Sequence, residues 1–477
     1  MQVKLKSRIF LIASIVLLAA AAGGYFRRSS ERRQIARNAA TLVPDLQGAH
    51  PELVERVQAA RAQIQLGGQP VEALATLTRL YYANGWFAPA ARTCAGLVEL
   101  EPHNPQWSYL LAIMRANSGQ LHEALPLLQQ TIRRAPDYLP ARLKIAAVLT
   151  KQNQADAAIA MEKIVLEKEP ANIYAWVGLG NIYVAQKKWD LARESFQKAL
   201  SFSDQFRSAW LGLVSVCEAT GDNNAAAEAQ SHVDTVSRSP DSPDPWIDTL
   251  LEECYNVYYL RVAASSIPDM IFAQRLLERA ARLQPKDAAV HRDFGMLLLR
   301  LRAYGEARHH LELATSLAPA DSDNWIGLIT LLRAIRDEAG IGQAIRSGLA
   351  QCPSSAGLWL ERGRMLRRTH AFDEALAAFA KSEELGAEDA APHVETAVVY
   401  FQMEQMEPAL RELKAALGLQ PNHPFAQVLM ARYAIMAGDK TTASFYFEKV
   451  RRNPSVLIED KKQLLEAFES AFGAGSR

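Results

Sequence analysis

The chain has 477 residues, of which 49% are hydrophobic and 22% are charged, and this balance excludes a disordered or collagen-like protein. Its 53 basic and 52 acidic residues give a formal net charge of +1, which excludes a nucleic-acid binder that relies on an overall basic surface. The four cysteines, Cys94, Cys217, Cys254 and Cys352, lie far apart. A disulfide-rich scaffold and a Cys-x-x-Cys metal, redox or haem site are therefore excluded too.

An uncharged apolar run extends from Ile9 to Phe26, with basic residues on both sides of it. Eighteen helical residues extend about 27 Å, which is just enough to cross the hydrocarbon core of a bilayer. Two interpretations stay open for residues 1–27. The run is either a retained membrane anchor or a signal peptide that is cleaved before Gly23. Five arginines directly after the run oppose its translocation and favour the anchor.

The side of the membrane on which the rest of the chain lies is less well determined, because the basic flanks are nearly balanced. A short basic N-terminal tail favours export of the following residues, whereas the downstream arginines favour the cytoplasm. We expect a periplasmic or extracytoplasmic location. A cytoplasmic location, or cleavage and secretion, are the alternatives.

Prolines recur in two series through the remainder of the chain. The spacing between Pro102 and Pro136 is repeated, singly or doubled, within each series. The first series is Pro102, Pro136 and Pro170, and the second is Pro285, Pro319, Pro353 and Pro421. A proline at a fixed interval ends a helix at the same place in each unit. Units of this length then begin at 71, 105, 139, 173, 207, 288, 322, 356, 390 and 424. The twentieth position is alanine in nine of these ten units, and the eighth is glycine or alanine in seven. Small residues at two fixed positions predict two closely crossing helices per unit.

The unit that begins at Ile173 contains Trp176, Leu179, Gly180 and Tyr183, followed by Ala192, Phe196 and Ala199. This pattern resembles the signature of the tetratricopeptide repeat (TPR) family, W-x2-L-G-x2-Y…A-x3-F…A…P, with Asp204 in place of the final proline. The resemblance extends over all ten units and suggests a membrane-anchored or exported bacterial type. It implies an all-α, right-handed superhelical solenoid of A and B helix pairs, with A helices lining a concave groove.

On this basis we predict six segments. They are a membrane anchor or signal segment (1–27), a basic linker with an N-terminal capping helix (28–70), a first TPR array (71–240), a proline-rich break with a degenerate eleventh repeat (241–287), a second TPR array (288–457), and a C-terminal capping helix and tail (458–477). Pro240 ends the first array, and the break begins with Pro243 and Pro245, with Asp244 as an expected N-cap. It exceeds the length of a repeat by about three helical turns, so we expect a long A helix that begins near Trp246 and keeps its phase.

The resemblance also indicates which side chains face the groove. In the first array they include Tyr82, Tyr109, Tyr174 and Asn181, and aromatic residues with polar tips suit the recognition of peptides or helices. Ordinary packing between repeats is the alternative for these residues. The family's clamp for chaperone tails is not predicted, because Val177 and Gly212 stand where that clamp needs Lys and Asn.

In the second array the groove positions are rich in arginine. They hold Arg292, Arg300, Arg333, Arg364, Arg367, Arg368 and Arg432. Arginine suits bidentate recognition of carboxylates, so these residues either bind an acidic partner segment or pair with neighbouring Asp and Glu of the same chain. In the break, Trp246, Tyr255, Tyr258 and Tyr259 form either a second contact surface on one helix face or a face that packs on the adjacent B helix.

The sequence contains no phosphate-binding loop, nucleophile motif or metal-ligand pattern. His309 and His310 are adjacent, so on a helix they point about 100° apart and suit a metal ion poorly. Pairing of Cys217 with Cys254 stays open for an exported chain. We therefore expect a non-catalytic, membrane-tethered scaffold that binds protein or peptide partners, without cofactor, nucleic acid or small-molecule substrate. The alternative is an assembly factor that presents client proteins of an envelope or cytochrome-type complex to a maturation enzyme.

Overall fold

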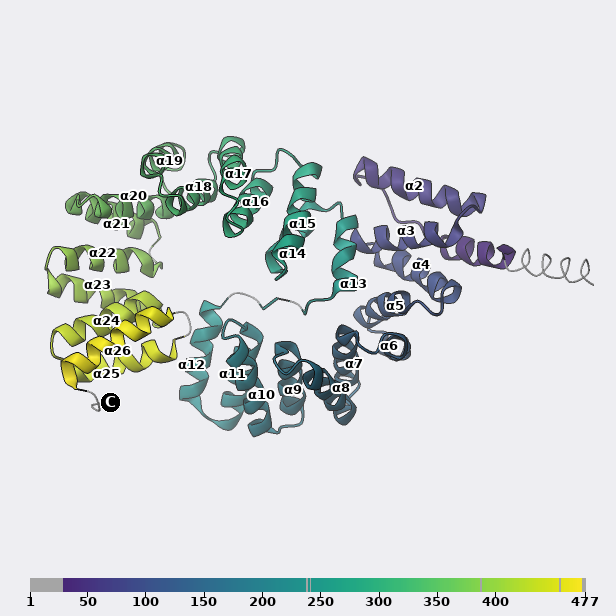
Figure 1. The fold of residues 1–477 in the computed structure, drawn as a ribbon, viewed down its shortest axis with the longest axis horizontal. Helices are drawn as coiled ribbons and strands as arrows, with labels where there is room; N and C mark the ends of the chain where they lie inside the picture. Colours follow the sequence, from purple (N-terminus) through teal and green to yellow (C-terminus); the bar gives the residue numbers. More distant parts are fainter. Residues whose placement is uncertain (1–28, 237–238, 241, 387, 454–455, 474–477) are drawn as a thin grey trace, which may run out of the picture. The chain divides into compact units, whose positions relative to one another are not determined.

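The computed structural model describes residues 29–236, 239–240, 242–386, 388–453 and 456–473. Within these ranges the secondary structure is entirely helical (Figure 1). The predicted membrane segment Ile9–Phe26 lies outside the described residues. None of the helices in the described part of the chain combines the length and apolar character needed to cross a membrane.

The predicted pairs of helices are confirmed. The A helices are α3 (Pro70–Ala83), α5 (Pro105–Asn117), α7 (Leu139–Lys151), α9 (Ile173–Ala185), α11 (Arg207–Thr220), α16 (Ala288–Arg300), α18 (Ser322–Ala334), α20 (Ala356–Arg368), α22 (Ala390–Gln402) and α24 (Pro424–Met436). The B helices are α4 (Phe87–Leu100), α6 (Leu121–Arg134), α8 (Ala155–Lys168), α10 (Trp189–Phe202), α12 (Asn223–Thr235), α15 (Met270–Leu283), α17 (Tyr304–Leu317), α19 (Glu338–Gln351), α21 (Phe372–Leu385), α23 (Met406–Leu419) and α25 (Lys440–Arg452).

Further helices lie at the two ends of the repeats. Helix α2 (Pro51–Leu66) packs on α3, and α26 (Ile458–Phe472) packs on α24 and α25. Residues 29–39, which we expected to be a linker, are helical as well. Ala36 and Ala39 of this helix are buried, and Arg37 donates a hydrogen bond to the backbone oxygen of Gln65 at 2.7 Å.

The chain divides into two compact units. One consists of the residues up to Ala199 together with Pro240–Pro268, and the other of Leu200–Ser239 together with Asp269–Arg477. In each unit, successive helices such as α5, α6 and α7, or α16, α17 and α18, contact one another along the stack, as expected for repeats that are too small to bury their own apolar face.

Small residues allow the two helices of a repeat to cross closely. The alanines at the twentieth position are all buried, and Ile341 takes their place in the one exceptional unit. Gly180 of α9 shows the reason for a small eighth position, because a Cβ atom there would lie 2.5 Å from Cε1 of Phe196. A larger residue in place of Gly180 would force the Phe196 ring or the two helices to move.

The fourth position of the unit makes the same polar contact in seven of the ten units. In four units a tryptophan donates its indole N–H to the backbone oxygen of the residue six positions earlier, at 2.7–2.9 Å, as Trp176 does to Pro170. In three other units Arg142, His291 and Gln427 make the equivalent contact, to Pro136, Pro285 and Pro421. In these units the side chain thereby satisfies a carbonyl in the loop that enters the repeat.

The turn between the A and B helices has a left-handed residue at the fifteenth position of all ten units. It is glycine in four units, such as Gly119, and another residue in six, such as Lys187 with φ 56° and Arg302 with φ 61°. Residues other than glycine adopt this conformation at some cost, so the turn geometry is imposed by the packing of the helix pair.

The break does not form the predicted long helix. It consists of α13 (Pro245–Asp248), a 3-10 helix η1 (Thr249–Glu253), and α14 (Val257–Ser266). The helical path ends at Cys254, whose ψ of 136° is extended. Asn256 then begins α14 as its N-cap, because its side-chain oxygen accepts a hydrogen bond from the backbone N–H of Tyr259. The expected phase-preserving extension of an A helix is therefore wrong.

Candidate functional site

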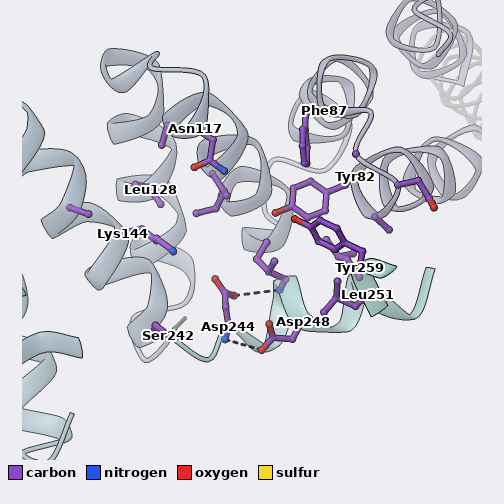
Figure 2. A pocket seen from close by; sticks show the side chains of 18 of the residues that line it. Tyr82, Phe87, Asn117, Leu128, Lys144, Ser242, Asp244, Asp248, Leu251 and Tyr259 are labelled. Carbon is purple, nitrogen blue, oxygen red and sulfur yellow. Dashed lines mark hydrogen bonds between the residues drawn. The ribbon is translucent and has the colours of Figure 1, made fainter. Parts of the chain in front are cut away.

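The candidate site is the groove that helices α3, α5 and α7 form in the first unit. We call residues 242–256 the insert; this segment lies against those three A helices (Figure 2). Trp246 and Ile247 of the insert pack against a core cluster that contains Tyr109, Ile113 and Ile145. The groove that we expected to bind a partner therefore already holds a segment of the same chain.

Asp244 is the polar centre of this contact and is only 6% exposed. Its carboxylate accepts a hydrogen bond from the hydroxyl of Tyr109 at 2.5 Å and a second one from the hydroxyl of Tyr138. The same carboxylate caps α13 by accepting from the backbone N–H of Ile247 at 3.4 Å, and the backbone N–H of Asp244 donates to Asp248 at 3.0 Å. Charge-assisted hydrogen bonds of this kind fix a buried carboxylate in place.

Trp246 stacks on the ring of Tyr138, with a centroid distance of 3.6 Å and an interplanar angle of 9°. It also meets Tyr109 edge to face at 5.7 Å. The backbone N–H of Trp246 donates to the hydroxyl oxygen of Tyr138 at 3.1 Å, so that hydroxyl both accepts and donates. Burial, and next the negative charge of Asp244, raise the pKa of both tyrosines, which keeps them protonated as donors.

The far end of the insert is held through both its backbone and its side chains. Asn84, directly after α3, donates to the oxygen of Glu253 at 3.0 Å and accepts from the N–H of Tyr255 at 2.8 Å. The guanidinium of Arg56 lies 2.5 Å from the carboxylate of Glu253. The buried Tyr255 donates to Glu52 at 2.9 Å.

A cavity of about 660 Å³ remains between the insert and the A helices. Tyr82, Phe87 and Tyr259 line one wall, and Lys144 and Lys151 contribute from α7 (Figure 2). Tyr82 meets Phe87 edge to face at 5.6 Å, and both Phe87 and Tyr259 are more than half exposed. The cavity therefore offers apolar rings and ammonium groups to a further ligand.

The predicted groove residues of the first array have different positions in the structure. Tyr82 lines the cavity, whereas Tyr109 is fully buried and its hydroxyl is bound to Asp244. Tyr174 and Asn181 of α9 are not among the residues that line this cavity. Our sequence analysis missed Asn84 and Tyr138. Both stand at positions outside the set that the TPR resemblance assigns to the groove.

The aromatic residues of the break do not share one helix face, which corrects our expectation. Tyr255 precedes α14 and is buried against His50, with ring centroids 5.3 Å apart. Tyr258 and Tyr259 lie on α14 and are 70% and 57% exposed. Trp246 belongs to α13, in the groove.

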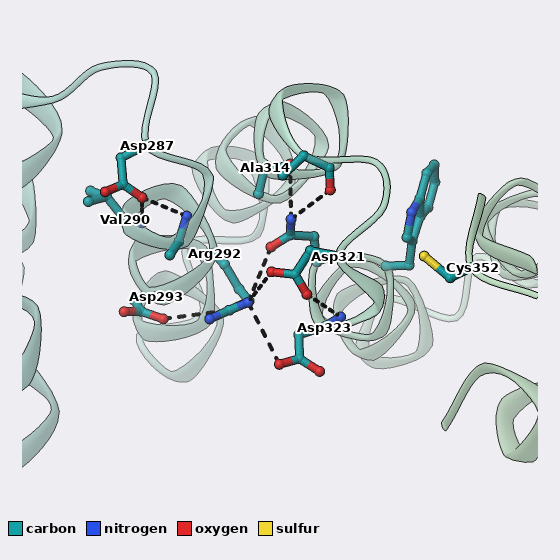
Figure 3. Close-up of polar contacts among 12 residues, drawn as sticks. Asp287, Val290, Arg292, Asp293, Ala314, Asp321, Asp323 and Cys352 are labelled. Carbon is teal, nitrogen blue, oxygen red and sulfur yellow. Dashed lines mark hydrogen bonds and ion pairs between the residues drawn. The ribbon is translucent and has the colours of Figure 1, made fainter. Parts of the chain in front are cut away.

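In the second unit the arginines pair with acidic residues of the same chain. Arg292 lies between Asp321 at 2.9 Å, Asp293 at 3.7 Å and Asp323 at 3.8 Å (Figure 3). Glu361 is 7% exposed and forms ion pairs with Arg333 and Arg364.

The remaining arginines show the same pattern. Arg364 and Arg367 both bind Glu395, Arg368 binds Glu338, and Arg432 lies 3.1 Å from Gln463 and 3.9 Å from Asp460. Arg300 at the end of α16 is exposed. Intramolecular pairing, one of our two expectations, is therefore what the structure contains for six of the seven arginines.

Other candidate reactive groups are held within the repeats. His291 and His310 lie with their Nδ1 atoms 2.9 Å apart, and burial lowers the pKa of His310 to about 4, with a further contribution from His291. No group of three or more metal-ligating side chains occurs among the described residues. All four cysteines are present as thiols, and burial raises the pKa of Cys94.

Comparisons with known proteins identify the repeats. One family model described as a tetratricopeptide repeat matches residues 116–161, and a second one matches residues 173–206, which confirms the expected repeat type there. No curated protein matches the sequence. Similar solved structures include yeast Tom70 (17% identity, TM-score 0.40, 84% of this chain and 95% of that one) and PilW, a type IV pilus biogenesis factor (22%, 0.36, 39% and 87%). The human IFIT1 dimer with m7Gppp-AAAA is also similar (15%, 0.34, 69% and 71%).

Proposed function

We propose that this chain is a non-catalytic scaffold that binds protein partners in the groove of its A helices. One observation carries the proposal: the groove of α3, α5 and α7 accommodates an irregular segment through two tyrosine hydroxyls, a stacked ring and a backbone-binding asparagine. Aromatic side chains with a polar tip are enriched at protein interfaces, because they combine a large apolar area with a hydrogen bond. The cavity beside the insert leaves room for a second segment.

A site-specific photo-crosslink tests this function. A photoreactive amino acid in place of Lys144, whose exposed side chain lines the cavity, should capture a defined set of proteins in living cells. The matched control is the same replacement at Ala160, an exposed position on the B helix α8. Capture of the same proteins at both positions, or of none at Lys144, contradicts groove binding.

Tethering to a membrane through Ile9–Phe26 is the second part of the proposal, with the repeats on the periplasmic or extracytoplasmic side. It is supported by the length of the apolar run and by its basic flanks. The retained anchor predicts that the mature protein keeps its N-terminus and stays in the membrane fraction after alkaline extraction. A mature chain that begins at Gly23 contradicts it.

An acidic partner segment for the second unit is the third part. It is supported by the gathering of arginines along consecutive A helices. Such a segment has to replace internal carboxylates such as Glu361 and Glu395, so its affinity depends on salt. Arg300 is the informative position, because Arg300→Glu alters an exposed side chain and leaves the internal pairs in place. Partner binding that is unchanged in this variant at low salt argues against an acidic segment.

The assembly-factor role differs from a general scaffold in the identity of the captured proteins. Capture of one client protein together with a maturation enzyme at Lys144 favours the assembly factor. Capture of structural partners alone favours the scaffold.

A further inference from the structure

The insert behaves as a ligand of the groove, because three consecutive residues make nearly all of its side-chain contacts at one end. Asp244 contributes the carboxylate that both tyrosine hydroxyls bind. Pro245 is the first residue of α13, where its fixed φ suits the start of a helix and its missing N–H costs nothing. Trp246 contributes the ring that stacks on Tyr138.

The groove side of this contact is specific for both groups. The hydroxyl of the fully buried Tyr109 has Asp244 as its acceptor, so an occupant without a carboxylate at this point leaves a buried donor unsatisfied. Tyr138 combines a ring that stacks on an aromatic residue with a hydroxyl that reads the backbone N–H of that residue. A chain that lacks either the acid or the aromatic residue therefore loses contacts that the other cannot replace.

At the other end of the insert, Asn84 contacts only backbone atoms. Asn84 donates to one peptide oxygen and accepts from the N–H two residues later, which is how an asparagine holds an extended chain irrespective of its side chains. The groove thus combines side-chain contacts, which give specificity, with backbone contacts, which accept any sequence; this combination is common in peptide recognition.

We propose that the groove of α3, α5 and α7 is a recognition site for peptides that carry an Asp-Pro-aromatic sequence, and that the insert is its internal ligand, which keeps the site closed. This rests on the proposed scaffold function and names the partner class of the same groove. The cavity beside the insert is the place where a competing segment first enters, since Phe87 and Tyr259 expose more than half of their surface there.

An internal ligand competes strongly because its effective concentration is on the order of millimolar. A free peptide therefore binds the wild-type chain weakly, and removal of the Asp244 and Trp246 side chains frees Tyr109 and Tyr138 for it. The probe is a fluorescein-labelled peptide with the sequence of residues 242–256, in which Cys254→Ser prevents oxidation. Its binding to the full chain is measured by fluorescence anisotropy.

We expect the double variant Asp244→Ala with Trp246→Ala to bind this peptide at least about tenfold more tightly than the wild type does. A peptide with the same two replacements should not bind. Adding Tyr138→Ala to the double variant should abolish binding of the original peptide. A double variant with unchanged helical content that fails to bind the peptide overturns the proposal, because the insert is then a structural joint.

The single variant Asp244→Asn keeps the shape of the insert and carries the test if the double variant does not fold. Tighter peptide binding than in the wild type supports an internal ligand, and equal binding overturns it. The outcome is separate from that of the crosslinking experiment, since the peptide comes from the chain itself. Peptide binding without captured partners refutes the scaffold function and leaves the recognition site intact.

Discussion

Glu162 stands where most of the other repeats place a buried apolar side chain, and its replacement by leucine should stabilise the protein. The equivalent positions hold Leu128, Phe196, Leu311 and Phe379, all of which are 0% exposed. Glu162 is 4% exposed, and its Oε2 atom has no hydrogen-bond partner. Burial raises the pKa of this carboxyl from 4.5 to about 8.

The magnitude follows from proton linkage. Because the folded state holds the proton up to about pH 8 and the unfolded state releases it above pH 4.5, the free energy of unfolding falls as the pH rises through this window. The slope is about 1.4 kcal/mol per pH unit, which gives a loss of about 3 kcal/mol at pH 7. Glu162→Leu should recover at least this amount, since the buried leucine adds its own apolar contribution.

Urea denaturation followed by circular dichroism, at steps from pH 5 to pH 9, measures the difference between the variant and the wild type. The gain should be smallest at pH 5, where the apolar contribution of leucine dominates, and should level off near pH 8. Glu162→Gln removes the charge while keeping the shape, and it should flatten the pH dependence of stability in the same way. Glu167→Gln, at an exposed position of the same helix, is the control and should change nothing. A gain from Glu162→Leu that is constant across this range refutes the reasoning, because the carboxyl is then ionised in the folded state.

Three further predictions concern single side chains. Burial lowers the pKa of His310 to about 4. The stability that its neutral form contributes is therefore present above pH 6.5 and is lost as the pH falls toward 4. His310→Leu should remove this acid sensitivity, as measured by thermal melts at pH 4 to 7. Gly180→Ala should destabilise the fold by about 1–3 kcal/mol, because the added Cβ meets Phe196. Gly418→Ala has open space around it in its helix and should stabilise the fold by up to about 1 kcal/mol. Equal effects of the two variants would contradict the packing argument. Glu361→Ala leaves two arginines without their shared carboxylate and should destabilise by about 3 kcal/mol in urea; a loss below about 1 kcal/mol would indicate that water replaces it.

The repeat architecture could be predicted from the sequence because each repeat depends only on its neighbours. Proline at the end of a unit, alanine at the twentieth position and a small residue such as Gly180 at the eighth all act within a single unit. The observed A helices accordingly begin within one residue of the predicted unit starts. The ion pairs of the arginines could also be predicted in part from the sequence. Arg333 and Glu361 are 28 residues apart and lie on consecutive A helices, so the same repeat frame brings them together.

The occupied groove was decided by the tertiary structure alone. Asp244 is 135 residues from Tyr109 and 106 from Tyr138, and no periodic pattern connects such distant positions. The sequence indicated a helix start at Asp244 and a surplus of residues in the break, and both are present. Local propensity favours a continuing helix after Trp246. Asn84 instead binds the extended backbone around Cys254. These groove contacts replace the hydrogen bonds of a continuing helix, and they form only when the first three repeats are stacked.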